Sequence, residues 1–180
     1  MAARAARRVL RPAGAAVLLA AALTMASCAA EPVVESAAPS DASAPSNGAV
    51  CEGVRVVVDF GELGEPGLDA CADTDETVTA LEAFDLAGVT LTEGEAFPGS
   101  ICRIDGAPAA DLELNYSGET HTEDCVNMGP VWAYWGLFLD AGTGWEYAQK
   151  GVAEQPVEPG QSIAFAWQFG DTAEPQLPTA

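Results

Sequence analysis

Four of the five cysteines in this chain lie beyond residue 50, and thiols at such spacings either pair as disulfides or bind a metal. They are Cys51, Cys71, Cys102 and Cys125. Zinc is disfavoured, because the sequence contains no Cys-x-x-Cys pair and only one histidine. An even number of cysteines in an exported chain instead indicates two disulfides. The chemistry of these thiols therefore depends on whether the chain is exported.

The first 27 residues predict export as a signal peptide. Four arginines precede an apolar run over residues 13–25, which is too short to span a bilayer as a mature helix. The run ends in Ala26-Ser27-Cys28, which is similar to a bacterial lipobox. We therefore predict lipidation at Cys28 and anchoring at the extracellular face of the cytoplasmic membrane. The alternative is an ordinary signal cut near Ala26 or Ala30, with secretion of the unlipidated chain.

Composition divides the rest of the chain into three parts. Residues 28–49 are rich in Ala, Ser and Pro with acidic side chains, which predicts a disordered tether. Residues 50–171 suffice for one domain with a core, and residues 172–180 are expected to be a flexible tail. After Cys28 only three basic residues remain against 27 acidic ones, a formal net charge of −24. This charge disfavours nucleic acids, and it disfavours membrane contact beyond the lipid.

The domain combines several strand patterns with one helix pattern. Every second residue from Val54 to Phe60 is apolar, which predicts a strand with one buried face. Residues 73–76 supply a cap and an acidic first turn for a helix to about Ala87, and Gly88 is expected to end it in the left-handed conformation. Further strands are expected over residues 89–92, 100–105, 131–139, 145–149 and 162–169. These elements predict an α+β domain, with one helix packed on a mixed sheet of about five strands.

This strand order also favours one of the three possible disulfide connectivities. Cys51 and Cys71 lie on segments expected to be neighbours, as do Cys102 and Cys125. We therefore predict the pairs Cys51–Cys71 and Cys102–Cys125.

Aromatic side chains are the strongest candidates for a binding surface. All four tryptophans lie in the last third of the chain, and period-two alternation in the strand 131–139 places aromatic side chains on both faces. One helix covers one face, so some of them are expected to line a groove for a neutral ligand or a protein partner. The candidates are Trp132, Tyr134, Trp135, Trp145 and Tyr147. The alternative is a core in which a loop covers the second face.

Enzyme chemistry is not indicated. The Ser-x-x-Lys, Gly-x-Ser-x-Gly and His-Glu-x-x-His motifs are absent, and His121 lies in a polar stretch that predicts an exposed loop rather than a metal ligand. Acidic residues crowd the segment 69–76, but calcium-loop spacing is missing and helix capping accounts for Asp75 and Glu76. We expect no catalytic residues, no cofactor and no metal site.

Several short segments of the domain occur in a recognisable order. They are VVVDFGELG (56–64), TALEA (79–83) with AG (87–88), ICRIDGAP (101–108), CVN (125–127), WAYW (132–135), GWEYAQKGV (144–152) and PG (159–160). This order resembles a family of actinobacterial secreted proteins related to the transcobalamin-like C-terminal β-grasp domain. The chain departs from that pattern by an insertion at 111–124 and at residues 161–166.

The resemblance implies a β-grasp-like fold and a surface that binds a corrinoid such as cobalamin. It also implies a transporter of the energy-coupling-factor type as partner. Two functions follow as expectations. The first is a membrane-tethered extracellular lipoprotein that captures a corrinoid or another small molecule for uptake. The second is a protein-interaction module of the cell envelope that uses its aromatic patch and has no small-molecule ligand.

Overall fold

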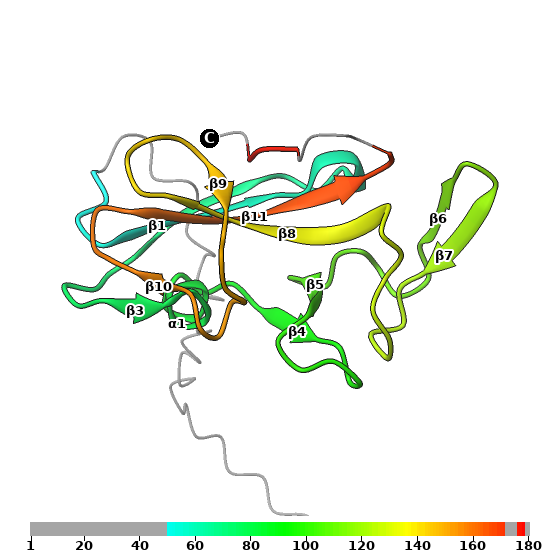
Figure 1. Ribbon diagram of the computed structural model, residues 1–180, viewed down its shortest axis with the longest axis horizontal. Coiled ribbons are helices and arrows are strands. Elements are labelled where there is room, and N and C mark those ends of the chain that lie inside the picture. Colours follow the sequence, from blue (N-terminus) through cyan, green and yellow to red (C-terminus); the bar gives the residue numbers. More distant parts are fainter. Residues whose placement is uncertain (1–49, 172–175, 179–180) are drawn as a thin grey trace, which may run out of the picture. The chain divides into compact units, whose positions relative to one another are not determined.

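A computed structural model describes residues 50–171 and 176–178; the predicted signal peptide, lipidation site and tether lie outside these residues. The main sheet has five strands in the spatial order β2-β1-β11-β8-β9 (Figure 1). They are β1 (Val54–Asp59), β2 (Leu68–Ala72), β8 (Ala133–Asp140), β9 (Glu146–Tyr147) and β11 (Ser162–Phe169). β1 and β11 are parallel at the centre, and the other neighbouring pairs are antiparallel. The predicted α+β domain, with one helix packed on a mixed sheet of about five strands, is confirmed within the described residues.

The helix is shorter than predicted. α1 spans Ala80–Leu86, and Thr79 caps it through reciprocal bonds with Glu82. The predicted cap at residues 73–76 is wrong, because the two residues before the helix form strand β3 (Val78–Thr79), which pairs with β10 (Pro156–Val157). The predicted end is confirmed, since Gly88 adopts a φ of +78° beyond the last turn.

Most of the core lies between the main sheet and α1, which Figure 1 places on one side of that sheet. The Phe84 ring packs 4.9 Å from the Phe165 ring, measured between centroids. The other face carries a small cluster around Phe138, on which Tyr147 stacks at 4.5 Å and against which Trp145 packs. The segment that follows β8 therefore covers the second face.

Three smaller features flank the sheet. A 3-10 turn, η1, spans Gly61–Leu63. Strands β4 (Leu91–Glu93) and β5 (Ile101–Ile104) form one hairpin, and β6 (Glu113–Tyr116) and β7 (Glu119–Thr122) form another. The insertion at 111–124 is thus a strand pair, and His121 lies on β7 with its side chain about three-quarters buried. The expected exposed loop around His121 is wrong.

Both predicted disulfides are present. Cys51–Cys71 joins the start of the domain to β2, with a Cα–Cα distance of 5.6 Å. Cys102–Cys125 joins β5 to the segment after β7, with a Cα–Cα distance of 5.4 Å. The second bridge therefore fixes the base of the segment that follows the inserted hairpin.

Part of the expected flexible tail is bound to the sheet. The Gln176 main-chain N–H donates to Oε1 of Gln168 at 2.7 Å, and Nε2 of Gln168 donates back to the Gln176 carbonyl at 2.9 Å. Gln168 is buried, and because its Nε2 also donates to the Ala166 carbonyl at 3.1 Å, the main addition from Gln176 is a donor for the Gln168 side-chain oxygen.

Candidate functional site

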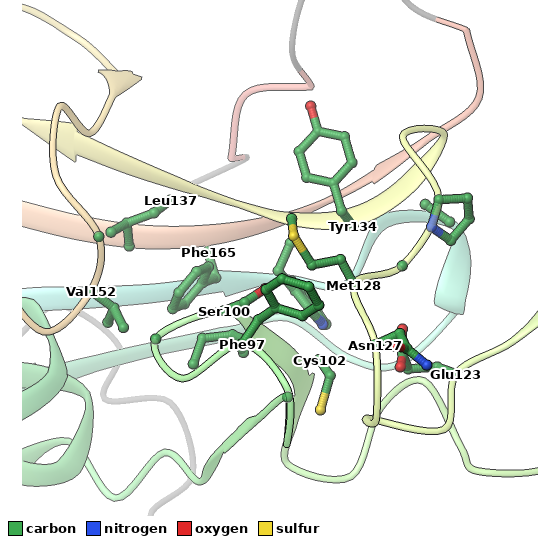
Figure 2. Close-up of a pocket in the computed structure, with 18 of the residues that line it drawn as sticks. Phe97, Ser100, Cys102, Glu123, Asn127, Met128, Tyr134, Leu137, Val152 and Phe165 are labelled. Atoms are coloured by element: carbon green, nitrogen blue, oxygen red, sulfur yellow. The ribbon is translucent and has the colours of Figure 1, made fainter.

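A cavity of about 440 Å³ lies between the main sheet and two loops that we call the rim loops, residues 94–100 and 123–131 (Figure 2). Strand β8 contributes Trp135 and Leu137 to its wall, and β11 contributes Phe165 and Trp167. Volumes of this size are typical of small-molecule sites. The cavity is therefore the best candidate for a functional site in the described part of the chain.

The rim loops supply apolar side chains that remain accessible to water. Val131 is 91% exposed, Met128 63% and Phe97 45%. Across the cavity lies Val152, whose carbonyl accepts a hydrogen bond at 3.0 Å from the Leu81 N–H in the first turn of α1. The helix therefore positions one wall, while the rim loops form an exposed apolar edge.

The two rim loops are joined to each other and anchored at one point. Main-chain N–H groups of Glu95 and Ala96 donate to the carbonyls of Cys125 and Val126, at 2.8 and 3.0 Å. Cys125 is in turn bridged to Cys102 on β5. These constraints hold both rim loops to the hairpin formed by β4 and β5.

Arg103 strengthens this anchor. Its Nε donates to the Pro108 carbonyl at 2.8 Å, its Nη1 contacts Sγ of Cys125 at 3.2 Å, and its Nη2 donates to the Glu123 carbonyl. The guanidinium on β5 thus binds main-chain and sulfur atoms of two other segments, at Pro108 and at residues 123–125. Arg103 is a structural clamp outside the cavity lining.

The five aromatic side chains expected to form one binding surface are divided by the sheet. Trp145 and Tyr147 cover the second face, as described above. The Tyr134 ring points away from the other lining side chains in Figure 2, and its hydroxyl lies 2.9 Å from that of Tyr147. Burial and this hydrogen bond raise the pKa of Tyr147. Of the five, Trp135 alone contributes a buried ring to the cavity wall.

Trp132 also departs from the expected arrangement. The residue precedes β8, and its ring packs against Tyr116 and Phe169, each 5.7 Å away between centroids. Its Nε1 donates to Oε2 of Glu119 at 2.8 Å. Trp132 therefore joins the inserted hairpin to the sheet and is not a cavity residue.

Two donors in the cavity wall lack a partner. The Nε1 atoms of Trp135 and Trp167 are buried and have no hydrogen bond within the described residues. Buried polar groups are nearly always paired, with protein or with ordered water. Both indoles line the cavity, with ring centroids 5.2 Å apart. Both N–H groups are shielded from solvent, including the solvent-accessible space of the cavity.

One carboxylate belongs to the lining. Glu123 is 5% exposed, and its Oε1 accepts a hydrogen bond from the Cys125 N–H at 2.7 Å. Its Oε2 lies 3.3 Å from Nε2 of His121. Sequence reasoning missed Glu123, Phe97 and Met128, because the cavity depends on how the rim loops fold over the sheet. A signal for the burial of Glu123 was available in Cys125, two residues later, because its predicted disulfide indicates that this segment is held against the domain.

The acidic and histidine side chains of the described residues form no metal-binding cluster, since no group of three or more His, Cys, Asp or Glu side chains there is arranged to hold a metal ion. Asp69, in the acidic segment 69–76, pairs with Arg55 at 2.6 Å on β1. No helix within residues 50–171 and 176–178 is long and apolar enough to cross a membrane.

Comparison with protein-family models, with curated proteins and with solved structures finds no match to this chain.

Proposed function

We propose that this protein is a lipid-anchored extracellular binding protein that holds a small, largely apolar molecule in the cavity. The observation that carries the proposal is the cavity of about 440 Å³, whose wall is formed mainly by apolar side chains of β8, β11 and the rim loops. The apolar wall would supply most of the binding free energy.

The resemblance to transcobalamin-like domains adds a proposed ligand class and a proposed partner. The ligand would be a corrinoid, and the partner an uptake transporter of the energy-coupling-factor type. A complete corrinoid, with its peripheral side chains, is larger than a cavity of about 440 Å³. It would therefore lie across Phe97, Met128 and Val131, with only a side group inside.

We propose binding without catalysis. The wall is mainly apolar, and both carboxylate oxygens of Glu123 are already engaged, by the Cys125 N–H and by His121. Holding a molecule is the role that this wall supports.

A protein partner is the second candidate function. The exposed apolar edge formed by Phe97, Met128 and Val131 is the observation that favours it. Exposed apolar side chains grouped in this way are typical of sites that another molecule covers. In this case the partner, a transporter or receptor subunit, would contact the edge and leave the cavity without a ligand.

The test is titration of the exported protein carrying Cys28→Ser, which removes the thiol that accepts the lipid and avoids detergent. N-phenyl-1-naphthylamine is a neutral apolar probe whose fluorescence rises in a dry site. We expect saturable binding of this probe, with quenching of tryptophan fluorescence. Hydroxocobalamin and cobinamide are titrated beside it by calorimetry. Absence of saturable binding in every titration contradicts the proposed cavity function.

The matched variants are Ser100→Phe and Thr92→Phe. Ser100 is half-buried in the lining, so a phenyl ring there fills the cavity, whereas Thr92 is exposed on the neighbouring strand and outside the lining. We expect Ser100→Phe to weaken probe binding at least tenfold, roughly 1.4 kcal/mol. Thr92→Phe should leave binding unchanged. Equal affinity in both variants would place the probe elsewhere on the protein.

A further inference from the structure

The cavity has a polar end and an apolar end. Figure 2 shows Glu123 and Asn127 on one side of it, and Leu137, Val152 and Phe165 on the opposite side. A molecule that spans the cavity therefore meets a carboxylate and an amide at one end and hydrocarbon at the other. This gradient is complementary to an occupant whose own polarity differs between its ends.

The charge at the polar end is negative. Among the described residues that line the cavity, Glu123 is the only one with a formal charge at neutral pH. Burial of a carboxylate costs free energy unless opposite charge or hydrogen-bond donors surround it. Here the donors are one main-chain N–H and the His121 ring, while Arg103 binds the main chain of Glu123 from outside the lining. A cationic group inside the cavity would add a partner that the protein does not supply there.

The surroundings of the cavity also favour a positively charged ligand. The lining also contains the aromatic side chains Phe97, Trp135, Phe165 and Trp167, and aromatic rings attract cations that approach their faces. The chain after Cys28 carries a formal net charge of −24, which draws cations toward the protein and repels anions. Three independent features therefore select against an anionic ligand.

We infer that the cavity binds a small amphiphilic cation, with an amine or ammonium group at Glu123 and an apolar body against the walls formed by β8 and β11. This inference rests on the proposed binding function, and it names the class of ligand. The apolar body excludes bulk water from the ion pair. Partial exclusion of water strengthens the attraction between the charges compared with an exposed pair.

The experiment uses three ligands with the same apolar body: 4-phenylbutylamine, 4-phenylbutan-1-ol and 4-phenylbutanoate. At pH 7 they carry charges of +1, 0 and −1. Each is titrated into the Cys28→Ser protein that holds N-phenyl-1-naphthylamine, and displacement of the probe gives the dissociation constant. We expect the amine to bind at least tenfold more tightly than the alcohol, and the carboxylate to bind most weakly.

The matched variants are Glu123→Gln and Glu95→Gln, which change the net charge equally. A glutamine at 123 retains an oxygen that can accept from the Cys125 N–H. Glu95 is exposed on a rim loop and outside the lining. We expect Glu123→Gln to lower the affinity for the amine to that for the alcohol. The affinity for the alcohol should be unchanged. Glu95→Gln should retain the preference for the amine.

The outcomes separate the two proposals. If the probe fails to bind the parent protein, the proposed cavity function is wrong. If the probe binds but the amine does not displace it, or displaces it no better than the alcohol, the cavity function stands and the inference about the cation is overturned. This comparison of ligands in the parent protein remains decisive even if Glu123→Gln fails to fold.

Discussion

Thr79 and Glu82 satisfy main-chain groups that the seven-residue helix α1 would otherwise leave unpaired. The Glu82 N–H donates to Oγ1 of Thr79 at 3.2 Å, and the Thr79 N–H donates to Oε2 of Glu82 at 2.8 Å. A helix this short has few internal hydrogen bonds, so its ends contribute much of its stability. Because both groups of Thr79 donate to the carboxylate, they lower the pKa of Glu82 below its ordinary value of 4.5.

We expect Thr79→Ala to lower the free energy of unfolding by about 1 kcal/mol, the usual effect of losing an N-cap side chain. Urea unfolding at pH 7 measures this. Thr143→Ala, at an exposed loop position, is the control and should change stability little. Equal effects of the two substitutions would contradict the role of the cap.

The pH dependence of the cap follows from the same shift. The pKa of Glu82 is lower in the folded state, so its stabilisation is fully present above the unfolded pKa and is lost as the pH falls through the folded pKa. The largest cause is the Thr79 main-chain N–H, which an alanine retains. In urea unfolding between pH 6 and pH 3, Thr79→Ala should therefore keep part of this acid dependence, and Glu82→Gln should lose it.

Single residues were predictable where local chemistry decides their conformation. Gly88 ends the helix as expected, because only local backbone geometry is involved. Trp132 was assigned to the strand that begins one residue later, so alternation placed its side chain on the wrong face. Glu123 was not recognised at all, because the sequence near it does not reveal that rim loops bury the carboxylate. Local sequence patterns contain no information about burial by segments that are distant in the chain.

Among the elements, the two disulfides offer a matched comparison. They close loops of similar length, with sequence separations of 20 and 23 residues, but only Cys102–Cys125 anchors the rim loops. Loop-closure entropy therefore predicts similar contributions to stability, about 3 kcal/mol each. Their contributions to the cavity should differ.

We expect the double variants Cys51→Ala/Cys71→Ala and Cys102→Ala/Cys125→Ala to lose similar stability, measured by urea unfolding. Only the second should weaken binding of N-phenyl-1-naphthylamine, by at least tenfold under conditions in which both are folded. If both variants bind the probe as the parent protein does, the rim loops do not depend on the Cys102–Cys125 bridge.

The predicted elements also differ in how well their bounds agree with the structure. The strand 162–169 was predicted with its observed bounds, since its apolar run is continuous and central. The helix was predicted to begin too early, because residues 73–76 look like a cap while β3 takes the following residues into pairing with β10. Pairing between segments far apart in the chain overrode the local cap signal.

At the scale of the whole molecule, the strand order was predictable only in outline. A mixed sheet with one helix follows from the alternation of patterns, and the disulfide pairs follow from that order. The cavity was not predictable, because it is formed where β8, β11 and two loops meet. Its position depends on tertiary packing of residues that are separated by up to about 70 positions in the chain.

Lipid anchoring is the prediction that belongs to the whole chain. We expect the protein to partition with membranes after cell fractionation and to incorporate a radiolabelled fatty acid. Cys28→Ala removes the acceptor thiol, so the variant should appear in the soluble fraction without label. A variant that remains with the membrane and a parent protein without label would contradict the proposed lipid anchor.

The junction between the two rim loops has a kinetic consequence. Because main-chain hydrogen bonds join the loops and one disulfide anchors them, they cannot separate without breaking those bonds. The Phe97 and Met128 side chains at the edge of the cavity are exposed, and rotation of exposed side chains takes picoseconds to nanoseconds. Association should therefore be limited by diffusion rather than by a conformational step, and rapid release would suit a protein that passes its ligand to another.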